Sequence, residues 1–142
     1  MKILKLRNTS IFSITMYLLQ VWIFTNIISS LSLIIIEKLV TGEKLNKNFL
    51  FEGVFWELTF YITIIGLVLS IPTIIILGLL IKTVTDNKLI IILASIVLLS
   101  ITFYFTGSMS LKNTKTLIPL PPIIYSTISS FLILIINFRN RN

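Results

Sequence analysis

The sequence predicts an all-α integral membrane protein, with four transmembrane helices in an up-down antiparallel bundle joined by short loops. The chain has 142 residues, of which 56% are hydrophobic and only 12% are charged. Soluble domains usually carry about a quarter charged residues. Four long apolar stretches, each close to the ~20 residues that cross a bilayer, cover residues 11–36, 55–81, 89–106 and 118–138. They leave no room for a soluble domain, so we expect a single transmembrane domain over residues 1–142.

The first stretch, residues 11–36, is the most polar of the four. On a helix, Gln20 points to one side, and six residues form a broad arc on the other: Thr15, Thr25, Asn26, Ser29, Ser30 and Ser32. Such side chains hydrogen-bond between packed helices in lipid, so we interpret the arc mainly as a packing face, with a wet cavity or a partner site as the alternative. A basic segment precedes the stretch, as in a signal peptide, but the stretch is longer than the 7–15 apolar residues of a signal peptide. We therefore expect a retained first span.

The second stretch, residues 55–81, has one ionisable residue, Glu57, at its entrance. At about 1.5 Å per residue its helix is roughly 40 Å long, more than the ~30 Å hydrocarbon core. Small and hydroxyl residues recur every three or four positions on one stripe: Thr59, Thr63, Gly66, Ser70 and Thr73. Gly66 and Ser70 allow another helix to approach closely. Pro72 lies on the opposite face and predicts a kink.

The third and fourth stretches also have polar faces. On the third, we expect one shared face for Ser95, Thr102 and Thr106. Three prolines stand near the start of the fourth, where a first helical turn tolerates them. Further along this stretch we expect one side to be lined by Ser126, Ser130 and Asn137.

The distribution of basic residues predicts the topology. An even number of spans places both termini on one side, together with Lys2, Lys5, Arg7, Lys82, Lys88, Arg139 and Arg141. The opposite side holds fewer basic residues, namely Lys38, Lys44, Lys47, Lys112 and Lys115. The positive-inside rule then places both termini in the cytoplasm. The frequent Ile, Lys and Asn are typical of an AT-rich bacterial genome, so we expect a multi-pass protein of a bacterial plasma (inner) membrane.

The composition argues against most chemistry. The chain has no Cys and no His, which excludes disulfides, thiol nucleophiles, histidine bases and thiolate or imidazole metal sites. Asp86 is the only Asp, and the nearest carboxylate pair, Glu52 and Glu57, lies at the membrane edge. The net charge of +7 is spread over flanks and loops instead of forming the basic face that nucleic-acid binding requires. We expect no enzyme, no cofactor or metal, and no nucleic-acid partner.

In length and number of spans the chain resembles the small multidrug-resistance exporters. That family relies on a carboxylate in the middle of its first span, whereas this chain has Gln20 and Asn26 there. A proton- or ion-coupled carrier normally needs an ionisable residue inside the membrane. Glu57 is the one substitute, and it lies close to the interface.

The leading hypothesis is a non-enzymatic membrane protein that packs against a protein partner, as an accessory subunit of a membrane complex or an immunity-type protein. The alternative is a homo-oligomeric pore or channel, or a small carrier, in which the hydroxyl stripes line a wet path between subunits. The partners expected are the lipid bilayer and either another protein or further copies of the chain. The candidate partner-contact or packing residues are Gln20, Asn26, Trp56, Glu57, Gly66, Ser70, Thr102 and Asn137.

Overall fold

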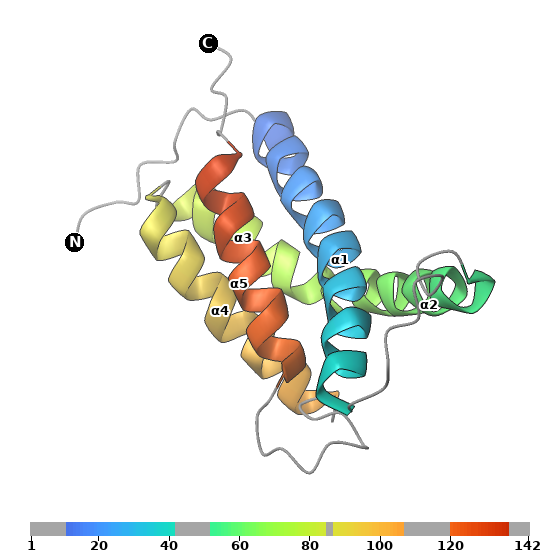
Figure 1. The fold of residues 1–142 in the computed structure, drawn as a ribbon. Helices are drawn as coiled ribbons and strands as arrows, with labels where there is room; N and C mark the ends of the chain where they lie inside the picture. The colour runs from blue at the N-terminus through green and yellow to red at the C-terminus, as the bar shows by residue number, and fades with distance from the viewer. Residues whose placement is uncertain (1–10, 42–51, 85–86, 107–119, 137–142) are drawn as a thin grey trace.

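Every element that the computed structural model describes is a helix. The described residues are 11–41, 52–84, 87–106 and 120–136. In chain order the helices are α1 (Ile11–Thr41), α2 (Gly53–Leu69), α3 (Ile71–Thr83), α4 (Lys88–Phe105) and α5 (Leu120–Ile135) (Figure 1). The all-α prediction is confirmed for this part of the chain.

In the part of the chain that the structure describes, two to three segments are long and apolar enough to cross a membrane. Ile11–Val40 and Lys88–Phe105 satisfy this requirement as single helices, and α2 and α3 satisfy it together as a bent pair. Helix α5 has 16 residues, or about 24 Å at 1.5 Å per residue. Large apolar side chains cover the outer surface of α4, where Leu89, Leu93, Val97 and Phe105 are all more than half exposed.

The stretch expected as one kinked span consists of two helices, α2 and α3, whose axes differ by 49°. The break falls at Ser70, which ends α2 and precedes α3. Pro72 follows in the first turn of α3, where it has no amide hydrogen to donate to the preceding turn. Its side chain is exposed, whereas those of Ser70 and Thr73 are buried. The kink at Pro72 is therefore confirmed, and it divides the expected single helix into two.

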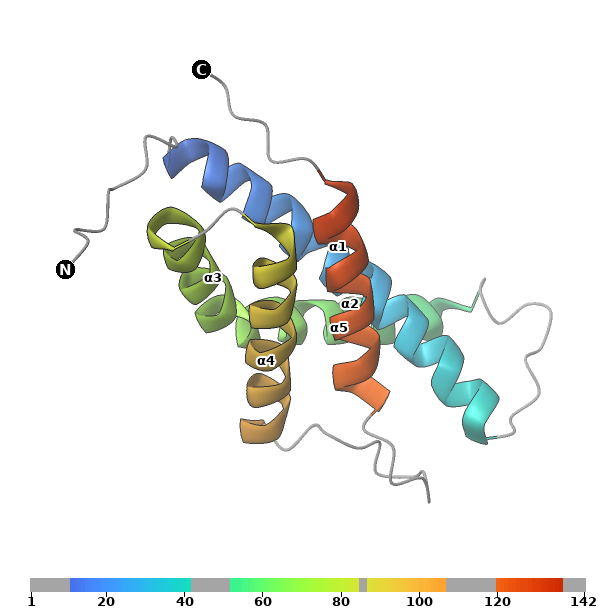
Figure 2. The same cartoon turned by 90° about the vertical axis from the view of Figure 1, so that its left-hand side faces the viewer.

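Four helices, α1, α5, α4 and α3, pack in that order around a shared core, and α3 closes the ring against α1. Neighbouring helices run in opposite directions, so α1 and α4 begin at the end of the bundle where α3 and α5 finish (Figures 1 and 2). The core near this end is almost entirely aliphatic and contains Ile14, Tyr17, Leu18, Val21, Leu77, Ile81, Ile91 and Ile133.

Helix α2 takes a different course from the other four. It leaves the bundle sideways at the bend and packs across α1 (Figure 1). A second, smaller core joins it to the C-terminal half of α1. Phe55 and Ile34 are buried there, and the partly buried side chains of Leu31, Ile35 and Ile62 pack against them. The bend thus lies between two hydrophobic cores.

Candidate functional site

The helices meet at the bend through polar side chains, which separate the two hydrophobic cores. We call five residues at this point the bend cluster: Trp22 and Asn26 of α1, Gly66 of α2, Ser70 at the break, and Tyr125 of α5. Tyr125 is buried, and its ring also packs edge to face against Phe103 of α4, with 5.1 Å between centroids.

Helices α1 and α2 meet in three successive steps, because residues four apart on α1 face the small stripe of α2. At the first step, the Trp22 indole Nε1–H donates to the Ser70 hydroxyl over 2.6 Å. At the third, the hydroxyl oxygens of Ser30 and Thr63 are 2.7 Å apart. Asn26 and Gly66 form the step between them. Thr63, Gly66 and Ser70 of the predicted stripe therefore lie on the face that packs against α1.

Gly66 gives Asn26 the space it occupies. A Cβ at position 66 would overlap the Asn26 Oδ1 atom and would lie 3.1 Å from the Tyr125 hydroxyl. The absence of a side chain at Gly66 therefore lets α1, α2 and α5 converge at one point. This is the close backbone approach that a small-xxx-small pair permits.

Three buried polar atoms of α1 have no hydrogen-bond partner among the described residues: Thr25 Oγ1, Asn26 Oδ1 and Ser29 Oγ. The Asn26 amide nitrogen Nδ2 donates to the Trp22 carbonyl over 2.9 Å, so the donor of this side chain has a partner within α1 and only its acceptor Oδ1 lacks one. An unpaired buried polar group costs about 1–3 kcal/mol. Burying these three side chains of α1 therefore has an energetic cost.

Two further hydroxyl pairs join the remaining helices. Ser95 of α4 and Ser129 of α5 lie 3.1 Å apart, and Ser129 is the donor if Ser95 keeps its own bond to the Ile92 carbonyl. Thr73 of α3 and Thr102 of α4 are also 3.1 Å apart. Each pair connects neighbouring helices of the bundle.

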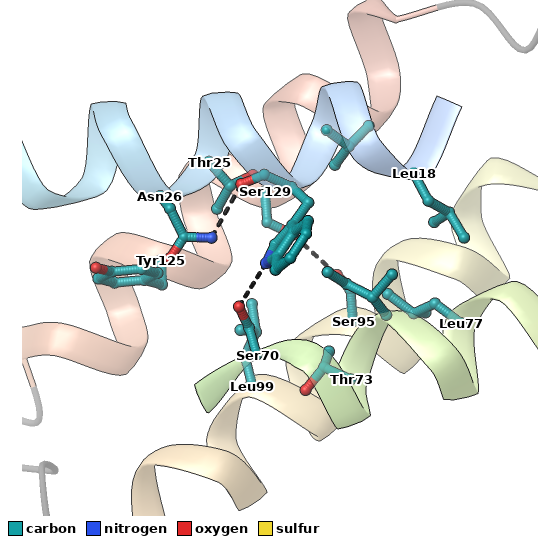
Figure 3. A pocket seen from close by; sticks show the side chains of 13 residues that line it. Leu18, Thr25, Asn26, Ser70, Thr73, Leu77, Ser95, Leu99, Tyr125 and Ser129 are labelled. Atoms are coloured by element: carbon teal, nitrogen blue, oxygen red, sulfur yellow. Dashed lines mark hydrogen bonds between the residues drawn. The ribbon is translucent and has the colours of Figure 1, made fainter. Parts of the chain in front are cut away.

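A cavity of about 50 Å³ lies beside these pairs. Figure 3 shows the polar side chains that surround it, Thr25, Asn26, Ser70, Thr73, Ser95, Tyr125 and Ser129, with leucines closing its sides. Sites for organic ligands measure about 300–1,000 Å³. The cavity is much smaller than that, and several of the polar groups around it, such as those of Ser70, Ser95 and Ser129, form hydrogen bonds between helices.

Four of the residues that the sequence singled out lie at contacts between helices, and three of them lie together. Asn26, Gly66 and Ser70 belong to the bend cluster, and Thr102 joins α3 to α4. Gln20 is exposed on the far side of α1. Trp56 and Glu57 are exposed in the first turns of α2, away from the cluster, and Asn137 lies outside the described residues.

Sequence reasoning missed Trp22, Tyr125 and Ser129. Trp22 precedes Asn26 by one helical turn, so continuing the polar arc of the first stretch backwards would have included its indole N–H. On α5, Ser126 and Ser130 were expected on the polar side, but the buried serine is Ser129. Ser130 instead donates within its own helix to the Ser126 carbonyl.

The chain matches no family model, no curated protein and no solved structure.

Proposed function

We propose that the protein spans the membrane four times, through α1, the bent α2–α3 pair, α4 and α5, and acts without catalysis by packing against another membrane protein through α2. It would serve as an accessory subunit of a membrane complex or as an immunity-type protein. The observation that carries this proposal is the course of α2, which turns 49° away from α3 and has α1 as its main helix neighbour.

The outer face of α2 suits such a contact. Trp56, Phe60 and Tyr61 are 57%, 63% and 64% exposed, and large aromatic residues are common anchors at the centres of protein interfaces. Glu57 is exposed beside them and would favour a partner with a basic residue at the same depth. Asn26 is only 2% exposed, so we place the contact on α2 alone and leave the face of α1 around Asn26 to internal packing.

The alternative pore would need hydroxyl stripes on the outside of the bundle. Ser30, Thr63, Ser95 and Ser129 instead pair with one another between helices, which favours the partner-binding proposal. We therefore expect liposomes containing only this protein to retain an entrapped fluorescent dye. Rapid release of the dye would support the pore and contradict the proposal.

The partner contact is tested by photocrosslinking in native membranes. A benzoylphenylalanine at Tyr61 of α2 is compared with one at Val97 of α4, which is 56% exposed and serves as the matched lipid-facing control. We expect a discrete crosslink to a different membrane protein from position 61 alone, and we expect Trp56→Ala to weaken it while the chain stays in the membrane. A crosslink to a second copy of the chain would support the homo-oligomer instead, and no protein crosslink from position 61 would overturn the proposal.

A further inference from the structure

A second hollow lies on the outside of the bundle, between the N-terminal half of α1 and the C-terminal half of α3. Its volume is about 350 Å³, within the range of about 300–1,000 Å³ that is usual for small-molecule sites. Its walls are almost entirely aliphatic: Ile11, Ile14 and Leu18 on one side and Ile74, Ile75 and Leu79 on the other. We call it the α1–α3 groove.

Gly78 forms part of the groove wall. A Cβ at this position would lie 3.2 Å from Leu18 Cδ1, so even a methyl group would crowd the space between the helices. Ile75 lines the groove from an exposed position. The groove is therefore open to the surroundings of the protein.

Lys82, in the last turn of α3, lines the groove where the apolar walls end. It makes no hydrogen bond or ion pair with any residue that the structure describes. Lys88, the other described cation at this end of the bundle, donates its Nζ–H to the Leu134 carbonyl over 2.6 Å. The described carboxylates are elsewhere, since Glu37 lies near the end of α1, and Glu52 and Glu57 lie at the start of α2. Among the described residues, no carboxylate therefore competes with an anion for the Lys82 charge.

We propose that the α1–α3 groove binds an anionic phospholipid, with an acyl chain against the aliphatic walls and the headgroup phosphate on the Lys82 ammonium. An ammonium group binds phosphate as a point charge, and a flexible acyl chain suits an apolar groove of this volume between two helices. This end of the bundle holds the start of α1 and the end of α5 (Figures 1 and 2). Along the sequence, the larger share of the basic residues lies next to these helix ends, and the positive-inside rule places that share at the cytoplasmic leaflet. Anionic lipids are concentrated in that leaflet.

A second copy of the chain is the competing occupant. An apolar helix from another copy would fill the walls but would leave the Lys82 charge without a partner. The charge therefore favours the lipid. This inference concerns the α1–α3 side of the bundle and stands independently of the partner contact proposed on α2.

The test is native mass spectrometry of the delipidated full-length protein after titration with dioleoyl phosphatidylglycerol or with dioleoyl phosphatidylcholine. We expect phosphatidylglycerol to half-saturate the protein at a concentration about tenfold lower than phosphatidylcholine does. Lys82→Gln should remove this preference, while the matched control Lys88→Gln should keep it. Ile75→Trp should weaken binding of both lipids by obstructing the groove, and Val97→Trp on α4 should not.

Circular dichroism of each variant checks that the helices are intact. The proposal is overturned if Lys82→Gln retains the preference for phosphatidylglycerol, or if Ile75→Trp binds both lipids as the unmodified chain does. It is also overturned if a crosslinker placed at Ile75 captures a second copy of the chain in place of lipid.

Discussion

The Trp22 indole of α1 donates a hydrogen bond of 2.6 Å to the hydroxyl of Ser70. Ser70 is the single residue between α2 and α3. The Ser70 hydroxyl in turn donates a hydrogen bond to the Gly66 carbonyl one turn earlier. The indole therefore joins α1 to the point at which the α2–α3 pair changes direction. Its hydrogen bond stabilises the bend from outside the bent pair itself.

Trp22→Phe should lower the stability of the protein by about 1 kcal/mol, which is the usual net value of one hydrogen bond. The phenyl ring retains most of the apolar contact, so the loss reports mainly the bond to Ser70. Thermal unfolding in detergent, followed by circular dichroism, measures the change. Trp56→Phe is the matched control, since Trp56 is 57% exposed and should tolerate the substitution. Equal losses from both substitutions would contradict this role for Trp22.

Gly66→Ala should destabilise the protein by about 1–3 kcal/mol, the typical cost of overpacking, because the added methyl group overlaps Asn26 Oδ1. Adding Asn26→Ala should recover most of this loss by removing the atom that the methyl group meets. A double-mutant cycle measures the coupling. Gly53→Ala is the control, because a Cβ there meets nothing within 4 Å. If the effects of the two substitutions simply added, the close approach of Asn26 and Gly66 would be wrong.

Two buried serines should respond to alanine in opposite directions. Ser29 is 0% exposed and its hydroxyl is unpaired, whereas Ser95 is 1% exposed and pairs with Ser129. Ser29→Ala removes an unsatisfied polar atom and should raise stability by up to about 1 kcal/mol. Ser95→Ala leaves the Ser129 hydroxyl without this partner and should lower stability by about 1 kcal/mol. Unfolding midpoints of the two variants under identical conditions decide the signs, and equal losses would contradict the prediction.

Pro72→Ala should straighten the α2–α3 pair. Alanine restores the amide hydrogen that proline lacks, so the helix can continue through the break. Spin labels at the exposed positions Tyr61 and Leu79 should then report a longer distance by pulsed electron resonance. Ile71→Ala, in the same turn, leaves the backbone donors unchanged and should leave the distance unchanged. An unaltered distance in Pro72→Ala would show that the contacts of α2 with α1 are sufficient to maintain the bend.

Helical periodicity predicted much of the inner surface. It placed Thr59, Ser70 and Thr73 on one stripe, and all three are buried. Periodicity could not predict which face of α5 is buried, because three nearby serines, Ser126, Ser129 and Ser130, offer similar hydroxyl groups. The choice of Ser129 follows from the rotation of α5, which also buries Pro122, Tyr125 and Ile133, and these large side chains control how the helix packs.

By itself, the sequence determined the helical class, the apolar stretches, the small-residue stripe and the presence of a kink at Pro72, because these depend on residues close together in the chain. Only the tertiary structure decided where α2 goes after the kink and what its stripe meets. A proline breaks a helix without choosing a direction. That direction depends on contacts made across the chain, such as Trp22 with Ser70 and Asn26 with Gly66, which exist only once α1 and α2 are packed together.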